Sequence, residues 1–294
     1  MRKNPNKMIK KAIIPCAGMG TRFLPATKVI PKELFPIIDK PITQLIAEEL
    51  SASGVSKIIF IINKEKESIR KYYSKDRALE KFLKQKGKIE LLKEVEAISK
   101  LAKFSFVYQN KPLGNGHAVL QAEKEIGREP FFVNWADDLI IGSSKPYFEQ
   151  LAEVYKKYKG PILSIIKTDE AGQRRYGIIK PRPIGKRVYQ VLSVVEKPGP
   201  ENAPSDLAHI GGFVLTPKIF KALKKIKPGK GGEIWLQDAI NEIAKKEPVY
   251  AYEFEGDYFD VGEKLGFLKT IVNMALKKEG LKEPFKKFLK EIKI

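Results

Sequence analysis

The sequence predicts an α/β protein built around a mostly parallel sheet, because apolar segments with strand character alternate with segments of helical spacing. Two of these apolar segments, 57–62 and 130–135, are hydrophobic at nearly every position, as strands buried on both faces of a parallel sheet are. The segments between them repeat apolar residues every three to four positions. No internal repeat or linker-like composition divides the 294 residues, so we expect a single domain.

The first predicted strand starts at Lys11 and runs into a loop with two glycines, Gly18 and Gly20, followed by Thr21 and Arg22. Glycines in this spacing let backbone N–H groups converge on one point, because no Cβ blocks the approach. A guanidinium offers two parallel donors that match phosphate oxygens. We interpret the loop as a cradle for a polyphosphate.

Two better-known phosphate loops do not match this segment. A Walker loop ends in Gly-Lys-Ser/Thr, and a dinucleotide-binding fingerprint has a third glycine where Phe23 stands, directly before a helix. Three prolines between 25 and 36 predict instead that the chain runs extended for about fifteen residues. Lys28 and Lys32 add positive charge to this loop. For the glycine pair alone, a tight turn without a ligand remains an alternative.

A helix is predicted from Pro41 to near Gly54, because proline at a first turn and glycine past the end fit the usual asymmetry. The strand at 57–62 follows. Residues 64–103 are rich in lysine and glutamate with helical apolar spacing, which predicts an insert of two or three helices packed on the flank of the sheet.

The alternation continues through the rest of the chain. The next predicted elements are a strand at 104–108, a loop at 109–116, a helix from 117, a strand at 130–135, a helix at 146–159 and a strand at 162–166. Short β segments with proline-rich loops over 176–215 predict a mixed or antiparallel extension laid over the open end of the sheet. The last predicted elements are helices at 217–226 and 234–246, a strand at 249–254, and helices at about 262–278 and 282–291.

The net charge of +20 raises nucleic-acid binding as an alternative function. The distribution of the charge argues against it, because lysines are mixed with glutamates along helical stretches and no zinc-finger, homeodomain or aromatic RNA-binding motif is present. A diffusely basic surface also suits small polyanionic substrates.

We expect a cytoplasmic protein without a membrane span. No apolar run approaches the ~18 residues that a span requires, and residues 1–10 lack the apolar centre of a signal peptide. The single cysteine, Cys16, cannot form an internal disulfide, which fits a reducing compartment.

Candidate metal ligands follow the strand at 130–135. Asp137 and Asp138 lie where open α/β sheets bind ligands, and Mg²⁺ is usually held by one or two carboxylates plus substrate phosphates. We expect Asp137 to bind the metal and Asp138 to support it, with capping of the next segment as the alternative. Asp260 precedes a predicted helix, so a helix cap and a second metal carboxylate both remain open.

Other polar residues carry weaker signals. Glu196 and Lys197 close a predicted strand, where a carboxylate can bind sugar hydroxyls and an ammonium can bind a sugar phosphate, although such pairs are common on surfaces. His117 is interpreted as a polar residue satisfied at a helix start, and His209 has no partner pattern. No arrangement for nucleophilic catalysis is indicated.

These motifs together resemble the bacterial-type UTP–glucose-1-phosphate uridylyltransferases, within the sugar-phosphate nucleotidylyltransferases, over roughly residues 10–290. The most specific match is 17–28, Ala-Gly-Met-Gly-Thr-Arg-Phe-Leu-Pro-Ala-Thr-Lys, in which the Leu-Pro-Ala-Thr-Lys part is particular to this branch. Further matches are found at 30–33, 39–41, 114–119, 176–177, 195–198, 232–234, 238–240 and 260–266.

The resemblance implies a Rossmann-like three-layer sandwich with a central mixed, mostly parallel sheet, the nucleotide-diphospho-sugar transferase fold. It implies a Mg²⁺-dependent reaction in which glucose 1-phosphate attacks the α-phosphate of UTP in line, giving UDP-glucose and pyrophosphate without a covalent enzyme intermediate. It also implies a homo-oligomer, a dimer or tetramer.

The resemblance further implies roles for matching residues. The nucleotide would be bound by Ala17, Gly18, Gly20, Thr21, Arg22, Lys32, Gln109 and Gly114, the last two reading the uracil. The sugar phosphate would be bound by Gly177, Glu196 and Lys197, and Mg²⁺ by Asp137 and Asp260. The catalytic residues would be Arg22, Lys32, Asp137 and Lys197.

The chain departs from the family pattern at a few positions. The family usually has leucine at Asn115, Gln-Leu-Thr at 235–237, glycine or proline at Ala136 and often arginine at Gly212. The first departure leaves the choice between UTP and dTTP open, and those at 235–237 and Gly212 leave sugar choice and assembly open. A non-catalytic nucleotide-sugar-binding regulatory subunit is a further alternative, although the loop arginine and both metal aspartates are present.

Overall fold

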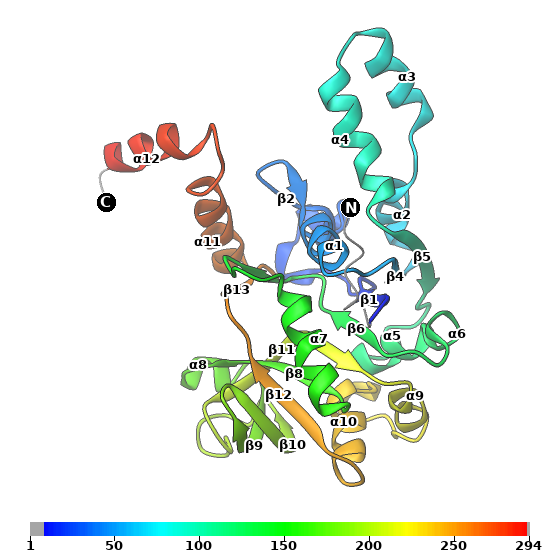
Figure 1. The fold of residues 1–294 in the computed structure, drawn as a ribbon, viewed down its shortest axis with the longest axis vertical. Coiled ribbons are helices and arrows are strands. Elements are labelled where there is room, and N and C mark those ends of the chain that lie inside the picture. Colours follow the sequence, from blue (N-terminus) through cyan, green and yellow to red (C-terminus); the bar gives the residue numbers. More distant parts are fainter. Residues whose placement is uncertain (1–8, 293–294) are drawn as a thin grey trace.

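The computed structural model describes residues 9–292, and its centre is a nine-stranded sheet (Figure 1). The strands in spatial order are β5 (Lys103–Tyr108), β4 (Lys57–Ile62), β1 (Lys11–Pro15), β6 (Phe131–Asn134), β11 (Leu207–Leu215), β8 (Ile162–Lys167), β12 (Val249–Glu253), β10 (Val188–Glu196) and β9 (Gly177–Gly185). In this sheet, β10 and β11 run opposite to the others. The predicted mixed, mostly parallel sheet is therefore confirmed.

The predicted extension over 176–215 is corrected by the position of β11, which lies inside the sheet between β6 and β8. All nine residues of β11 are buried, because the strand, His209 apart, is apolar or small on both faces and so suits a central position. β9 pairs with both β10 and β11, so the strands β11, β8, β12, β10 and β9 close on themselves. This closure brings Gly177 opposite His209.

Helices cover both faces of the sheet and make the predicted three-layer sandwich (Figure 1). One face packs against α1 (Ile42–Ala52), α2 (Glu67–Tyr73) and α7 (Tyr147–Tyr158). The other packs against α5 (Asn115–Gln121), α6 (Glu123–Ile126), α9 (Lys218–Leu223) and α10 (Leu236–Ala244). Each face has its own hydrophobic cluster, with Phe60 in the first and Phe213 in the second.

The charged segment 64–103 contains α2, α3 (Arg77–Gln85) and α4 (Ile89–Lys100). The sequence predicted that all helices of this insert pack on the flank of the sheet, and this is correct only for α2, which buries Ile69 and Tyr73. α3 buries Leu83 alone and α4 buries no residue. α3 and α4 project from the body as a helical hairpin (Figure 1). Their lysine and glutamate side chains are better solvated there than against the sheet.

The loop after β1 also differs from the prediction, because it winds through three short 3-10 helices at Thr21–Phe23, Ala26–Lys28 and Lys32–Leu34 instead of running extended. Pro25 and Pro31 each stand directly before one of these turns, with φ of −84° and −52°. Proline's restricted φ is compatible with the start of a turn as well as with an extended chain.

The remaining elements lie at the edges of the sheet. Two small sheets are formed by β2 (Pro36–Ile37) with β3 (Lys40–Pro41) and by β7 (Asp138–Ile141) with β13 (Asp257–Asp260). The other helices are α8 (Glu170–Gln173), α11 (Lys264–Ala275) and α12 (Lys282–Glu291), with short 3-10 turns at Lys64–Lys66 and Lys230–Gly232. Among the helices described, none has the length and apolar character to cross a membrane.

Candidate active site

Two adjoining clefts of about 490 and 410 Å³ open at the carboxyl edge of the parallel strands. This is the edge at which open α/β sheets bind ligands. Ala17, Gly18, Lys32, Gln109 and Gly114 line the first cleft, which we call the nucleotide cleft. Arg22, Asp260, Gly177 and His209 are among the residues that line the second, which we call the acceptor cleft. The two clefts share Asn115, Trp135, Asp137, Glu196 and Lys197.

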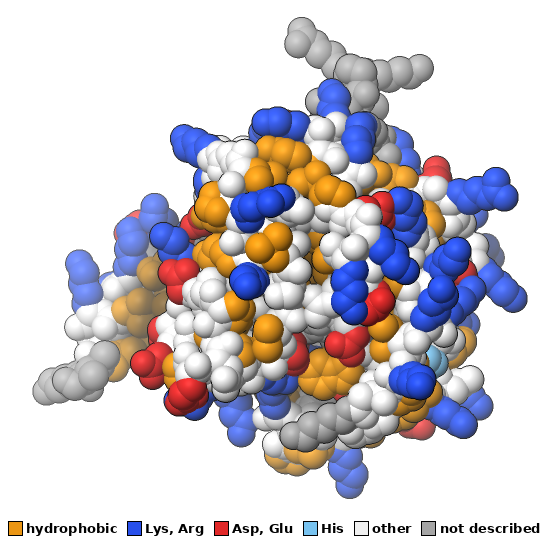
Figure 2. Space-filling model, turned by 90° about the horizontal axis from the view of Figure 1, so that it is seen from below, with side chains coloured by type: hydrophobic (Ala, Val, Ile, Leu, Met, Phe, Trp, Pro, Cys, Tyr) orange, Lys and Arg blue, Asp and Glu red, His pale blue; other side chains and the backbone are white. Residues whose placement is uncertain are grey.

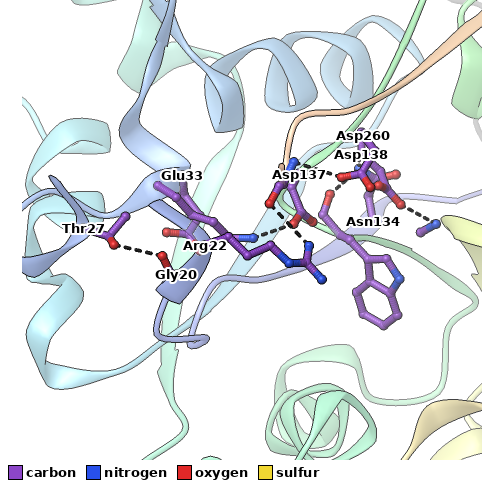
Figure 3. Close-up of polar contacts among 12 residues, drawn as sticks. Gly20, Arg22, Thr27, Glu33, Asn134, Asp137, Asp138 and Asp260 are labelled. Carbon is purple, nitrogen blue, oxygen red and sulfur yellow. Dashed lines mark hydrogen bonds and ion pairs between the residues drawn. The ribbon is translucent and has the colours of Figure 1, made fainter. Parts of the chain in front are cut away.

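The glycine loop forms one wall of the nucleotide cleft. Gly20 has φ of +66°, a left-handed conformation that favours glycine, and its carbonyl accepts a hydrogen bond from Thr27 Oγ1 at 2.8 Å (Figure 3). A Cβ built on Gly18 would meet no atom within 4 Å, so this backbone faces open space. Gly20 and Thr21 lie in the same loop but are not among the residues lining the two clefts.

A buried ion pair anchors this loop. Lys66 Nζ donates to both carboxylate oxygens of Glu33 at 2.7 Å, and the two side chains are only 7% and 2% exposed. Burial raises the pKa of Glu33, and the charges of Lys66 and Lys32 oppose that rise. The pair connects the turn that contains Lys32 to the chain that follows β4. Removing either partner would leave a buried charge without compensation, so this connection is costly to break. The sequence analysis did not identify this pair.

Asp137 lies where the two clefts meet. Asn134, at the end of β6, shapes the turn before it by donating to the carbonyl oxygens of Trp135 and Asp138 at 2.8 and 3.0 Å (Figure 3). Lys32 Nζ forms an ion pair and hydrogen bond with Asp137 Oδ2. Burial acts to raise the pKa of Asp137, but the charge and hydrogen bond of Lys32 outweigh burial, so the pKa is lowered.

Asp138 accepts its hydrogen bonds from residues of two other strands. Its Oδ2 accepts from the backbone N–H of Gly211 at 2.6 Å, and its Oδ1 accepts from the Tyr258 hydroxyl at 2.8 Å. Burial, together with the charges of Asp137 and Asp260, raises its pKa well above the ordinary value. The carboxyl group therefore links β7 to β11 and β13, which fits the supporting role expected for it.

Asp260 ends β13 and is not the cap of the following helix, since Glu263 occupies the N-cap position of α11. The helix-cap alternative is thus wrong for this residue. Its Oδ1 accepts from the Gly262 N–H at 2.9 Å and its Oδ2 from Arg175 Nη2 at 2.6 Å. Burial and the charge of Asp137 raise the pKa of Asp260, while the hydrogen bond from the Gly262 N–H and the charge of Arg175 oppose the rise.

The carboxylates of Asp137 and Asp260 converge above Gly262. A Cβ placed on Gly262 would lie 2.3 Å from Asp137 Oδ2 and 3.0 Å from Asp260 Oδ1. Within residues 9–292 there is no group of three or more acidic, histidine or cysteine side chains suited to a metal. A pair of carboxylates beside a substrate cleft is nevertheless a donor set that fits Mg²⁺, because this ion commonly takes its other ligands from water and phosphate.

Gln109 and Gly114 line the nucleotide cleft, and Gln109 contacts His117. Gln109 Nε2 donates to the Gly114 carbonyl at 3.0 Å and lies 2.9 Å from His117 Nδ1. The other ring nitrogen of His117 lies 3.0 Å from Gln121 Nε2, so both ring nitrogens have polar neighbours, in line with the prediction of a polar residue at a helix start. Gly114 has φ of +92°, and a Cβ there would lie 2.7 Å from the Ile234 carbonyl oxygen.

The Asn115 departure has a structural role that the sequence did not reveal. Asn115 Oδ1 accepts from the backbone N–H of Leu236 at 2.8 Å, which links the start of α5 to the start of α10. The side chain also lines both clefts.

The acceptor cleft contains the predicted residues Gly177, Glu196 and Lys197. Lys197 has φ of +46°, and its Nζ lies 3.5 Å from Glu196 Oε1 and 5.6 Å from the centre of the Trp235 ring. Glu196 Oε2 accepts from Gln237 at 2.8 Å. Burial raises the pKa of Glu196 against the opposing charge of Lys197. Lys197 is half exposed, which leaves its ammonium available to an anion in this cleft.

His209 also lines the acceptor cleft, and its titration gives a test of the fold. Burial lowers its pKa from 6.5 to about 4, so between these values the unfolded chain binds more protons than the folded one and stability falls as the pH is lowered. Between about pH 7 and about pH 5 we expect the wild type to lose about 2 kcal/mol more unfolding free energy than His209→Leu. Urea titrations at both pH values measure this difference, and equal losses would contradict a buried, neutral His209.

Comparison with known protein families agrees with this geometry. The sequence pattern of the family described as Nucleotidyl transferase matches residues 11–277. A relative from Staphylococcus saprophyticus subsp. saprophyticus, named UTP–glucose-1-phosphate uridylyltransferase 2, is 46% identical over 288 residues, which cover 98% of this chain and 99% of that protein. A relative of the same enzyme name from Staphylococcus haemolyticus is 46% identical over 286 residues, covering 97% and 99% of the two chains.

Solved structures are similar over nearly the whole chain. A UDP-glucose pyrophosphorylase complexed with UDP-glucose is 38% identical with a TM-score of 0.85, covering 92% of this chain and 100% of that one. A UTP-bound UGPase from Acinetobacter baumannii is 34% identical with a TM-score of 0.90, covering 97% and 100%.

Proposed function

The chain belongs to the nucleotidyl transferase family, and on this premise we propose that it transfers the uridylyl group of UTP to glucose 1-phosphate, giving UDP-glucose and pyrophosphate. The observation that carries the proposal is the pair of adjoining clefts that meet at Asp137. Gly18 and Lys32 line only the first cleft, Arg22 and Gly177 line only the second, and both clefts contain Glu196 and Lys197.

The proposed reaction is a single in-line displacement. An oxygen of glucose 1-phosphate forms a bond to the α-phosphorus of UTP as the bond from that phosphorus to pyrophosphate breaks, and the electron pair leaves with pyrophosphate. Such a transfer depends mainly on positioning and charge stabilisation, so no protein nucleophile is required. The cationic side chains at the meeting point of the clefts support this assignment.

We assign the binding and catalytic roles by position. Ala17, Gly18 and Lys32 line the nucleotide cleft and are assigned to the triphosphate, together with Gly20, Thr21 and Arg22, which continue the same loop. Gln109 and Gly114, which also line this cleft, read the base. Gly177 and Glu196 bind sugar hydroxyls, and Lys197 binds the phosphate of the acceptor. Arg22 and Lys32 stabilise charge on the departing pyrophosphate, while Lys197 reduces the repulsion between two anionic substrates.

We assign Asp137 and Asp260 as the residues that would hold a divalent metal, Mg²⁺, which would supply positive charge to neutralise phosphate oxygens there. The convergence of both carboxylates above Gly262 supports the assignment. Lys32 pairs with Asp137 and Arg175 with Asp260, so each of these carboxylates has a cation beside it in this structure.

We also propose one nucleotidyltransferase domain, a cytoplasmic homo-oligomer and no nucleic-acid partner. α12 buries none of its ten residues, so the described chain does not by itself stabilise this short helix, and a second copy is a suitable partner. On the face drawn in Figure 2, lysines and arginines are scattered among apolar and uncharged groups, unlike the continuous basic stripe that binds a nucleic-acid backbone.

Pyrophosphate release with glucose 1-phosphate and Mg²⁺, compared across UTP, dTTP, ATP, CTP and GTP, tests the function. We expect release with UTP to be at least about tenfold faster than with dTTP, which differs by a base methyl and a ribose hydroxyl. Equal or faster use of dTTP would support the thymidylyl-transferring alternative. A folded protein that binds UDP-glucose but releases no pyrophosphate would support the regulatory alternative.

A further inference from the structure

Two side chains in the acceptor cleft have no role in the reaction as assigned. His209, on β11, and Gln237, in the first turn of α10, both line this cleft and are only 5% and 7% exposed. Both ring nitrogens of His209 and Oε1 of Gln237 are buried without a hydrogen-bond partner among the described residues. A buried polar atom without a partner lowers stability, so such atoms in one small region call for an explanation.

The geometry around Gly177 brings these atoms together with Glu196. The pairing of β9 with β11 sets His209 directly opposite Gly177. A Cβ on Gly177 would lie 2.3 Å from His209 Nε2 and 3.0 Å from Glu196 Oε2. The missing side chain lets the imidazole pack directly on the Gly177 backbone. Together with Glu196, these groups line the part of the acceptor cleft that we call the recess.

Gln237 borders the Glu196 side of this recess. Its Nε2 donates to Glu196 Oε2 at 2.8 Å, which fixes the carboxylate and leaves the amide oxygen of Gln237 as an unused acceptor.

The hydrogen-bonding character of the recess matches a neutral polyol. A buried, neutral imidazole offers one donor and one acceptor, and the oxygens of Glu196 and Gln237 accept. A sugar hydroxyl both donates and accepts, so hydroxyl groups can satisfy all of these atoms. An anionic substituent on the sugar would instead face the acceptor oxygens of Glu196 and Gln237.

We propose that His209 and Gln237 bind hydroxyl groups of the acceptor sugar and thereby determine which hexose phosphate the enzyme accepts. The nitrogens of His209 lie beneath the cleft surface, so the proposal includes a rotation of the imidazole about its side-chain torsion angles when the sugar binds. The inference rests on the proposed function, because it assigns two specificity-determining residues to the same acceptor site.

Steady-state kinetics with glucose 1-phosphate and each of its monodeoxy analogues tests the proposal. We expect His209→Leu and Gln237→Met each to raise the KM for glucose 1-phosphate roughly tenfold or more, with the KM for UTP changed less than about twofold. For the one analogue that lacks the contacted hydroxyl, wild type and variant should have the same KM. A purely structural role would raise the KM for every analogue alike.

Two further variants keep the test interpretable. Thr216→Val removes another buried hydroxyl without a partner, located just after β11 and away from both clefts, and should leave both KM values unchanged. His209→Gln keeps a donor and an acceptor and is expected to retain part of the discrimination between glucose 1-phosphate and the analogue, even if His209→Leu fails to fold.

The outcomes separate this inference from the proposed function. An active wild type whose variants discriminate among the analogues as the wild type does would overturn the inference alone. Equal increases in the KM for UTP and for glucose 1-phosphate would also overturn it. A wild type that transfers no uridylyl group to glucose 1-phosphate would overturn both the function and the inference.

Discussion

The Arg22→Ala variant is expected to turn over UTP and glucose 1-phosphate about 10²- to 10³-fold more slowly than the wild type, as when one preorganised donor is removed from an active site. Arg22 lies on the glycine loop and lines the acceptor cleft beside Asp137 and Asp260 (Figure 3). Its Nη1 donates to the Gly262 carbonyl at 3.3 Å, a long contact that positions the guanidinium without being essential to the fold.

The same loop supplies a matched control. Lys28 is an exposed cation that lines neither cleft, so Lys28→Ala should change kcat by less than about threefold. Arg22→Lys keeps the charge but loses the two-pronged donor geometry, and it should fall between wild type and Arg22→Ala. Pyrophosphate release at saturating substrates measures all three variants. Near-normal turnover of Arg22→Ala would show that this arginine is not part of the charge stabilisation.

Much of the site was predictable because local sequence determines it. Gly20 must adopt a positive φ to turn the loop, and Asp137 follows a buried strand by only a few residues, so both are visible in a short window. The strands at 57–62 and 162–167 were also predicted closely, since continuous apolar runs bounded by turn signals are a strong local pattern.

What the sequence did not reveal depends on pairs of residues far apart in the chain. Glu33 and Lys66 are both charged, and nothing local indicates that they bury each other across 33 positions. The central place of β11 depends on its antiparallel pairing with β6 and β8, which no periodicity specifies. That pairing is also what places His209 in the acceptor cleft, so the residue had no detectable partner pattern in the sequence.

Asp137→Asn is expected to lower kcat on the order of 10³-fold, because it removes a carboxylate that we assign to the metal, and a bound metal contributes several kcal/mol of transition-state stabilisation. The fold should tolerate the change. The ion pair of Asp137 with Lys32 involves side chains that are 21% and 19% exposed, but asparagine keeps an oxygen acceptor for Lys32, so the unfolding free energy should fall by no more than about 1–3 kcal/mol. Turnover as a function of Mg²⁺ concentration, together with thermal unfolding, measures both effects.

Asp138→Asn is the control that separates metal binding from structure, since the two carboxylates are adjacent in sequence but have different partners. Asp138 accepts from Gly211 and Tyr258 with its two oxygens, and asparagine can replace only one of these acceptors. The lost hydrogen bond should lower the unfolding free energy by about 1–3 kcal/mol while kcat falls less than about tenfold. If Asp137→Asn retains more than about a tenth of the wild-type kcat at saturating Mg²⁺, Asp137 does not bind the catalytic metal. A large loss of kcat in Asp138→Asn would then assign the metal to Asp138 instead.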